Sequence, residues 1–340
     1  MTFNIVINTD DKYLQHAMAM LCSLYENNRE HYIIVHILHK GLSEVAKNLL
    51  VELSNRYENR VVFYTVDDRK LEGVQFRKKR PLSMAAYYRL LLSSVLPKDL
   101  DKVLYLDCDM IVIRNIQEIF KIEIDNYALA ATLDFFPYTE KHRLQLHMEV
   151  GERTFCSGIM MVNLKYWREN NVEPGLIEYA KRHREEVYLH DQDVLNYYFK
   201  KKWFLLPPKW NHTAGNLRIA TQPELKKFDY MAYAKEPMIY HYASVGIKPW
   251  YNAPTPDKNL YVEYLEKSGY PTVKYEKKPL SVRARLTILT LKYNIKRQIL
   301  MLLFRFHLMG GVIRKDKCSE LFFVLNYATT TLQVEFKFAA

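Results

Sequence analysis

Glycine is scarce in this sequence: the 340 residues contain ten, and none of them falls in a GxGxxG or a GxxxxGK[ST] motif. In those motifs, backbone N–H groups of a glycine-rich loop bind phosphate at the start of a helix. A chain without such a loop that binds a nucleotide diphosphate needs another source of positive charge, and a metal ion can supply it. The scarcity of glycine therefore argues against a dinucleotide-binding or P-loop enzyme.

Disulfide frameworks, zinc ribbons and membrane-spanning segments are not indicated either. The four cysteines, Cys22, Cys108, Cys156 and Cys318, are far apart and form no CxxC pair, which is typical of a reducing compartment. The first residues, MTFNIVINTD, show no feature of a secretion signal. The uncharged apolar run Gln298–Phe304 is far shorter than the roughly 20 residues that a spanning helix needs. We therefore expect a cytoplasmic protein.

The positive charge of the chain is concentrated in one segment. Of the net charge of +11, residues 274–317 hold +10, from twelve Lys and Arg against two acids, which leaves +1 for the rest. A nearly neutral body does not favour binding to nucleic acid, so no nucleic-acid partner is predicted.

The first part of the chain alternates between strand and helix patterns. Strand patterns cover residues 3–8, 32–38, 60–66 and 102–107, and helix patterns cover residues 12–27, 43–57 and 83–96. This alternation predicts an α/β fold with a Rossmann-like, mainly parallel sheet and flanking helices. In such sheets, ligands bind beyond the carboxyl ends of the strands. Two pairs of acids lie at such ends, Asp10 with Asp11 and Asp107 with Asp109.

The pattern is looser in the second part. Strand patterns cover residues 127–134, 157–164 and 237–242, and helix patterns cover residues 164–183 and 191–200. Five prolines between residues 249 and 279 indicate a loop-rich connector. We therefore predict a main domain of residues 1–250, a proline-rich connector of residues 251–279 and a tail of residues 280–340.

The tail has a helical hydrophobic pattern flanked by basic residues. The apolar positions are spaced by three or four residues: Ile288, Leu291, Ile295, Ile299, Leu302 and Phe306. A basic amphipathic helix of this kind is typical of binding to an anionic membrane surface, here the inner face of the membrane. The alternative is a terminal helix that packs on the body. Residues 318–340 give no interpretable pattern.

The segment VLYLDCDMIV, residues 103–112, places two carboxylates inside an apolar run. In an extended segment residues i and i+2 point the same way, so Asp107 and Asp109 face one point while Cys108 turns back into the core. Two carboxylates so close repel each other unless a cation lies between them, and Mn²⁺ or Mg²⁺ suits oxygen ligands. The alternative is a pair of solvated loop acids.

Paired aspartates without a glycine loop are expected in a metal-dependent nucleotide-sugar transferase. The same string occurs in haloacid-dehalogenase phosphatases, in which the first aspartate, here Asp107, is the nucleophile. In those enzymes the motif lies near the start of the chain and is followed by Gly or Thr, whereas here about a hundred residues precede it and MIV follows. The phosphatase is therefore the less favoured reading.

Seven short motifs follow one another between Asn4 and Trp250: NTDDKY (8–13), AAYYRLLL (85–92), KVLYLDCDMIV (102–112), LDFF (133–136), FCSGIMMVNL (155–164), LHDQDVLN (189–196) and HYASVGIKPW (241–250). With these motifs in this order, the chain resembles the retaining glycosyltransferases of family 8. The resemblance is to the type that adds galactose or glucose to lipopolysaccharide, with glycogenin as a distant relative, and it implies a GT-A type fold.

The resemblance also implies a role for each residue of the site. The metal would be held by Asp107, Asp109 and His241. The nucleotide sugar would be bound by Asn8, Thr9, Asp10, Tyr13, Arg89, Asp107, Cys108, Asp134, Cys156, Ser157, Gly246 and Lys248. Independently of the resemblance, the charge of Arg89 on a largely apolar helix needs a partner, and we expect Asp134 or the donor. The catalytic residues would be Asp191 and Gln192. Two departures from the family pattern are Cys156, where Asn is usual, and one extra residue between His241 and Lys248.

Glutamine is a poor nucleophile, so Gln192 does not suit the double displacement that uses two carboxylates. We expect front-face attack, with the Gln192 amide oxygen stabilising positive charge and the departing phosphate taking the acceptor proton. The predicted reaction moves galactose or glucose from a UDP-sugar to a hydroxyl of a lipopolysaccharide, glycolipid or polysaccharide. The non-enzymatic alternative is an inactive membrane-bound scaffold of the same fold.

Overall fold

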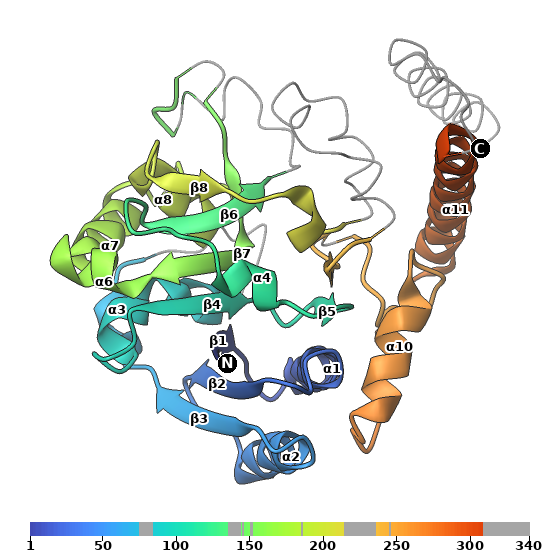
Figure 1. The fold of residues 1–340 in the computed structure, drawn as a ribbon, viewed down its shortest axis with the longest axis horizontal. Coiled ribbons are helices and arrows are strands. Elements are labelled where there is room, and N and C mark those ends of the chain that lie inside the picture. The colour runs from blue at the N-terminus through green and yellow to red at the C-terminus, as the bar shows by residue number, and fades with distance from the viewer. Residues whose placement is uncertain are drawn as a thin grey trace. The chain divides into compact units, whose positions relative to one another are not determined.

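The computed structural model describes residues 1–74, 84–134, 144, 146–149, 152–184, 186–213, 236–244 and 246–308 (Figure 1). The chain forms two compact units. The first contains Met1–Thr213, Pro237–Ala243 and Leu260–Val273, and the second contains Ser244–Asn259 and the described residues from Lys274 onward. All strands named below belong to the first unit.

A seven-stranded sheet forms the centre of the first unit, in the order β3-β2-β1-β4-β7-β6-β8. The strands are β1 (Thr2–Asn8), β2 (Tyr32–His39), β3 (Arg60–Thr65), β4 (Lys102–Leu106), β6 (Leu129–Leu133), β7 (Phe155–Asn163) and β8 (Trp203–Leu205). Neighbouring strands are parallel except for β7, which runs antiparallel to both β4 and β6. The predicted mainly parallel sheet is therefore confirmed.

The chain order reverses beside β1, because β2 and β3 lie on one side of it and β4 lies on the other. Such a switch point opens a crevice at the carboxyl ends of the two central strands, where ligands bind in sheets of this type. A second, two-stranded sheet continues from there: β5 (Met110–Val112) pairs antiparallel with β9 (Ile239–His241), and Met110 lies opposite His241.

Helices cover both faces of the sheet (Figure 1). On one side lie α1 (Leu14–Glu26) and α2 (Glu44–Asn55), and on the other lie α3 (Leu92–Val95), α6 (Leu164–Glu169), α7 (Val172–Arg182) and α8 (Asp191–Tyr198). Short elements complete the unit: α4 (Gln117–Phe120) and the 3-10 helices η1 (Asp68–Leu71), η2 (Met84–Leu91) and η3 (Pro208–Trp210). The hydroxyl of Ser43 accepts a hydrogen bond from the Ala46 N–H at 3.2 Å and so caps the start of α2.

Two predicted helices differ from the structure. The pattern at residues 83–96 forms the 3-10 helix η2 followed by the single turn α3. The pattern at 164–183 breaks into α6 and α7 at Asn171, whose backbone is left-handed with φ of 48°. Asparagine adopts this conformation more readily than most residues, and the apolar periodicity does not register the break.

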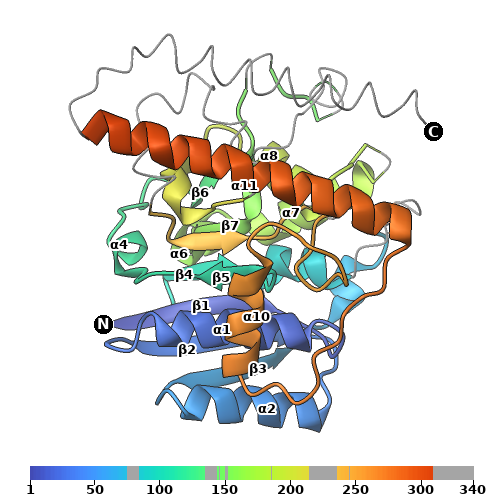
Figure 2. The same cartoon turned by 90° about the vertical axis from the view of Figure 1, so that its right-hand side faces the viewer.

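The predicted connector contains a helix that the sequence pattern missed, α10 (Lys258–Lys267). Its later part lies against α1 (Figure 2), where Gln15 donates to the Tyr261 hydroxyl at 2.9 Å and Asn27 donates to the Tyr264 hydroxyl at 2.8 Å. The prediction of a loop-rich connector is therefore wrong for these ten residues. The prolines on either side indicated a loop, but the segment between them forms a short helix whose tyrosines are buried. The predicted domain boundaries themselves remain predictions.

The second unit contains α11 (Leu280–Leu308), at the position predicted for the amphipathic tail helix. Four residues of the predicted apolar stripe are exposed: Ile288, Leu291, Ile295 and Leu302. Within this unit the Tyr293 hydroxyl donates to Asp257 at 2.8 Å. Phe306 and residues 318–340 lie outside the described side chains. Among the helices described, none combines the length and the hydrophobicity needed to span a bilayer.

Candidate active site

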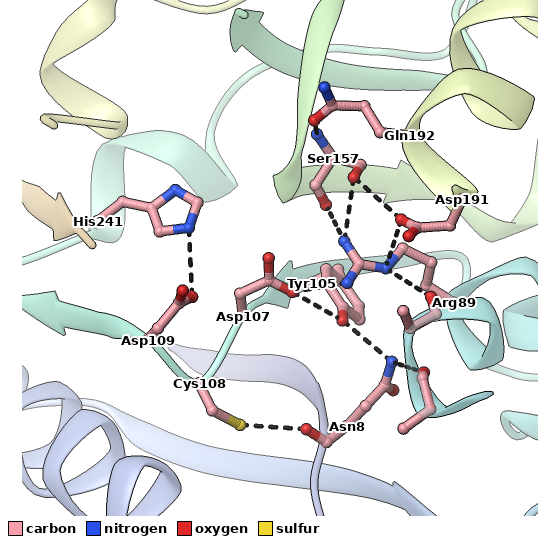
Figure 3. Close-up of polar contacts among 12 residues, drawn as sticks. Asn8, Arg89, Tyr105, Asp107, Cys108, Asp109, Ser157, Asp191, Gln192 and His241 are labelled. Carbon is pink, nitrogen blue, oxygen red and sulfur yellow. Dashed lines mark hydrogen bonds and ion pairs between the residues drawn. The ribbon is translucent and has the colours of Figure 1, made fainter. Parts of the chain in front are cut away.

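The two aspartates of the VLYLDCDMIV segment lie where the chain passes from β4 to β5, at the carboxyl end of a central strand. Cys108 between them is buried, and its thiol donates to the Asn8 carbonyl oxygen at 3.1 Å (Figure 3). Cys108 therefore turns towards the core, as the alternation of an extended chain predicts. The segment between β4 and β5 therefore places the side chains of Asp107 and Asp109 on the side opposite Cys108, facing β9.

His241, the last residue of β9, completes a cluster of three possible metal ligands. One ligand atom from each of Asp107, Asp109 and His241 lies within 4.8 Å of the other two. His241 Nε2 is 3.2 Å from Asp109 Oδ1, and His241 Nδ1 is 3.0 Å from Asn211 Oδ1. Asn211 therefore fixes the ring so that Nε2 faces the carboxylates, as neighbouring hydrogen bonds commonly do for histidine ligands.

The charges of this cluster suit a bound cation. Burial raises the pKa of Asp107. The positive charge of Arg89 opposes this increase, and repulsion from Asp109 adds to it. Burial disfavours the charged form of His241, but the adjacent Asp109 outweighs it and raises the His241 pKa to about 10. The imidazolium proton therefore compensates Asp109, and a divalent ion can replace that proton. Two carboxylates and one imidazole form a donor set that accepts Mn²⁺ or Mg²⁺.

Arg89, on η2, links this cluster to the other acids of the site. Its guanidinium is buried and lies 2.7 Å from Asp107 Oδ1 and 3.1 Å from Asp191 Oδ2. It also donates to the Ser157 carbonyl oxygen at 2.7 Å. A buried charge of this kind requires partners, and the sequence analysis expected Asp134 or the donor. That expectation is wrong for Asp134: the partners are Asp107 and Asp191.

Asp191 and Gln192 begin α8 and face β7. Burial raises the pKa of Asp191 to about 6, while Arg89 opposes the increase and Asp107 adds to it. The Ser157 hydroxyl donates to Asp191 Oδ2 at 3.1 Å. Gln192 Oε1 accepts the Ser157 N–H at 3.0 Å, and Gln192 Nε2 donates to Asp134 Oδ2 at 2.8 Å. The amide group of Gln192 therefore has a fixed orientation between β6 and β7.

The backbone immediately before α8 is strained. His190 has φ of 55° and ψ of −126°, a combination that a residue with a side chain seldom adopts and that costs on the order of 1–3 kcal/mol. Such strain is found where a structure must hold a neighbouring group in a defined place. Here the neighbour is Asp191.

The end of β1 supplies the other predicted contacts. Asn8 Nδ2 donates to the Tyr105 hydroxyl at 3.0 Å, whereas the buried Asn8 Oδ1 has no hydrogen-bond partner among the described residues. Thr9 is buried, and Asp10 Oδ1 accepts the Tyr13 N–H at 2.9 Å. Tyr13 is 43% exposed, so a flat ligand can reach it.

Three predicted residues are less closely tied to this arrangement. Cys156 is buried in β7, next to Ser157, and contributes to the raised pKa of His241. Gly246 and Lys248 belong to the second unit, in which Lys248 is buried and its Nζ lies 5.3 Å from the centre of the Trp250 ring. Their predicted contact with the nucleotide sugar therefore remains a prediction.

Three further residues that shape the site were not predicted from the sequence. Gly158 is buried in β7, and a Cβ atom there would lie 2.6 Å from His241 Cε1 and 2.8 Å from Asp107 Oδ2. The Tyr105 hydroxyl donates to Asp107 Oδ1 at 3.1 Å. The third residue is Asn211, which orients His241. An isolated glycine in an apolar strand was the available signal for Gly158, because glycine there often marks a close approach.

Comparisons with known proteins show which family the chain is similar to. The family model described as Glycosyl transferase family 8 matches residues 4–253. General stress protein A of Bacillus subtilis (strain 168) is 28% identical over 279 residues, which make up 79% of this chain and 95% of that protein. Lipopolysaccharide 1,2-glucosyltransferase of Escherichia coli (strain K12) is 26% identical over 321 residues, 91% of this chain and 88% of that protein.

Among solved structures, the galactosyltransferase LgtC in complex with donor and acceptor sugar analogs has a TM-score of 0.67 at 23% identity. The similarity covers 84% of this chain and all of that one, 100%. It establishes the GT-A type fold that the sequence indicated. With the family match over most of its length, the chain belongs to glycosyl transferase family 8. This membership favours sugar transfer over the phosphatase reading.

Proposed function

We propose that this protein transfers a hexose from a UDP-sugar to a hydroxyl of a lipopolysaccharide, glycolipid or polysaccharide, with a divalent metal ion. The observation that carries the proposal is the cluster of Asp107, Asp109 and His241 at the carboxyl end of β4, joined through Arg89 to Asp191. The E. coli relative, a lipopolysaccharide 1,2-glucosyltransferase, supports this acceptor class. Galactose and glucose are both candidate sugars.

Asp107, Asp109 and His241 would hold Mn²⁺ or Mg²⁺. When bound, this ion supplies the positive charge that stabilises the diphosphate leaving group. The sequence contains no glycine-rich phosphate-binding motif whose backbone N–H groups could do so instead. Lys248 would add a second positive charge on the diphosphate. The Asp107 carboxylate is oriented before the ion binds, because Arg89 and Tyr105 both donate hydrogen bonds to its Oδ1.

The end of β1 would bind the nucleoside. Asp10 would accept the base N–H, and the half-exposed ring of Tyr13 would stack on the base. The buried Asn8 Oδ1 is an acceptor that a ligand hydroxyl can satisfy. Thr9 and the backbone at Cys108 complete this side of the site.

Arg89, Asp134, Ser157 and Asp191 would hold the donor sugar, with Cys156 nearby. Asp191 is engaged by Arg89 and by the Ser157 hydroxyl, so it acts as a fixed hydrogen-bond acceptor. A carboxylate paired in this way is not a free nucleophile. This arrangement supports attack of the acceptor from the same face as the leaving group, with retention of configuration.

Gln192 would stabilise the positive charge that develops on the sugar. Its amide oxygen accepts a hydrogen bond from the Ser157 N–H at 3.0 Å, which fixes the position of that oxygen. Its amide nitrogen is tied to Asp134, which prevents rotation of the group. The developing charge therefore meets an oriented dipole, the type of preorganised group that contributes most to catalysis.

The basic α11 would attach the enzyme to an anionic membrane surface on the cytoplasmic face. Its exposed apolar residues include Ile288, Leu291 and Ile295, and residues 274–317 carry +10 of the net charge. Apolar burial in the headgroup region and attraction to anionic lipids then act on the same helix.

The release of UDP from a panel of UDP-hexoses, with Mn²⁺ or with EDTA, tests the proposed function. A transferase is expected to hydrolyse its own donor slowly and only with the metal. A phosphatase would instead act on phosphomonoesters, and an inactive scaffold would do neither. Donor cleavage that is equally fast in EDTA would contradict the proposal.

A further inference from the structure

A second cluster of side chains with suitable metal-ligand atoms lies at the end of α7. It consists of His147, His183 and Glu186, and one ligand atom of each lies within 4.8 Å of the other two. Glu186 Oε2 is 2.8 Å from His183 Nδ1 and 3.6 Å from His147 Nε2. None of these residues belongs to the candidate active site, and the proposed sugar transfer gives them no role.

The backbone holds His147 in place from both sides. Its neighbours Leu146 and Met148 are buried and form a small apolar cluster with Leu189. Lys200 Nζ donates to the carbonyl oxygen of His147. The backbone of His147 is left-handed, with φ of 52°, so the fold accepts an unfavourable conformation at this residue.

Stacked rings hold His183 in place. Its imidazole stacks on Tyr179 with ring centres 4.3 Å apart, and Tyr179 stacks on Tyr197 at 3.8 Å. The ring of His147 meets His183 edge-on at 5.7 Å. Stacking therefore orders the His183 imidazole before any ligand arrives, which lowers the entropy lost on binding one, while the more exposed His147 ring meets it at its edge.

We propose that His147, His183 and Glu186 bind a zinc ion. In tetrahedral zinc sites the ligand bonds are about 2.0–2.2 Å long, which places neighbouring ligand atoms about 3.3 Å apart. The observed separations from Glu186, 2.8 Å and 3.6 Å, lie on either side of that value. Small side-chain movements therefore suffice to close the site. Water would take the fourth position, since all three side chains are partly solvent-accessible.

The donor set selects the metal. Two imidazoles and one carboxylate favour zinc over manganese and magnesium, which prefer oxygen ligands. The Asp107, Asp109 and His241 cluster has the opposite balance, with two carboxylates and one imidazole. The two sites would therefore bind different ions from the same solution.

The position of the cluster gives zinc binding a structural consequence. His147 precedes β7, which carries Ser157, and Glu186 lies in the segment that leads from α7 to Asp191. A zinc ion would link these two segments, which both lead into the candidate active site. Bound zinc would then stabilise the folded state, as any ligand specific to that state does.

Zinc titration of the full-length, tag-free protein after removal of metals with EDTA tests the proposal. The background variant is Asp109→Asn, which weakens the other cluster. In that background we expect one zinc ion to bind per chain, with no competition from equimolar Mn²⁺. His147→Ala and Glu186→Gln are expected to raise the zinc Kd at least about tenfold. Glu149→Gln, a change of the same kind in a neighbouring exposed residue, serves as the control and should leave the Kd unchanged.

Thermal unfolding provides the second measurement. Zinc should raise the Tm of the background variant and of the Glu149→Gln control, and it should have little effect on the Glu186→Gln variant. Glu186 lies at the surface, so this variant remains informative even if His147→Ala disturbs the fold. The proposal would be overturned if the background variant bound no stoichiometric zinc. It would also be overturned if zinc bound equally well to Glu186→Gln.

Discussion

Gly158 provides a sharp test of the site, because its missing side chain makes room for two of the proposed metal ligands. A Cβ atom at this position would lie 2.6 Å from His241 Cε1 and 2.8 Å from Asp107 Oδ2. Carbon atoms in contact are normally about 3.5–4.0 Å apart, so Gly158→Ala requires a movement of roughly 1 Å. Gly158 does not have a left-handed backbone, so alanine fits the local conformation and the overlap alone causes the effect.

The overlap cannot be relieved cheaply. Asp109 and Asn211 hold His241, and Arg89 and Tyr105 hold Asp107. Overpacking of a well-packed core typically costs about 1–3 kcal/mol, so Gly158→Ala should fold with reduced stability. A misplacement of about 1 Å at a reacting centre costs on the order of 10²-fold in rate. We therefore expect Mn²⁺-dependent UDP binding and donor turnover to fall about 10²-fold.

Two other glycines provide matched controls. A Cβ atom at Gly41 would meet nothing within 4 Å, so Gly41→Ala should leave stability, UDP binding and turnover unchanged. A Cβ atom at Gly175 would overlap the side chain of Tyr198, outside the site, so Gly175→Ala should lose stability but keep Mn²⁺-dependent UDP binding. Calorimetric titration of UDP with Mn²⁺, together with thermal unfolding, separates these outcomes. Normal UDP binding by a folded Gly158→Ala protein would refute the reasoning.

Three further expectations concern chemistry, attachment and pH. Gln192→Ala should lower kcat with little change in the donor KM, because the proposed charge exists mainly in the transition state; an increase in KM alone would contradict this role. Truncation at Pro279 should release the protein from anionic vesicles in co-sedimentation, and equal sedimentation of both forms would contradict attachment through α11. Burial lowers the pKa of His36 to about 4, so the unfolded chain, with a pKa near 6.5, is protonated first as the pH falls. The His36 contribution to stability should therefore decrease by up to about 3 kcal/mol between pH 6.5 and 4, and the pH-dependent denaturation of His36→Gln, compared with the wild-type protein, should lack this contribution.

Six of the seven strands of the main sheet were predictable because their apolar patterns are long and bounded by polar residues. The seventh, β8 (Trp203–Leu205), was missed because it has only three residues. The direction of β7 was not predictable, because all nine of its residues are buried and their sequence does not indicate which strands they pair with. The break at Asn171 and the helix α10 were missed for a related reason. Each depends on packing or on one backbone conformation, neither of which appears as a periodicity in the sequence.

The site was predictable as a set of residues but not as a network. The spacing of Asp107 and Asp109 indicated a common direction, and the structure brings His241 to them through the pairing of β5 and β9. The partners of Arg89 could not be derived, because several acids lie at the same edge of the sheet. Gly158 could be singled out only once the atoms near its missing side chain were known.

Equilibrium binding of UDP, measured with Mn²⁺ and with EDTA in the wild-type protein and in Asp109→Asn, tests the central claim most directly. If Asp107, Asp109 and His241 hold the ion on which the diphosphate depends, the wild-type protein binds UDP with Mn²⁺ and loses most of that affinity in EDTA. Asp109→Asn then behaves with Mn²⁺ as the wild-type protein does in EDTA, and its turnover falls on the order of 10²–10³-fold. Tight UDP binding in EDTA, or normal Mn²⁺-dependent binding by Asp109→Asn, would contradict the account.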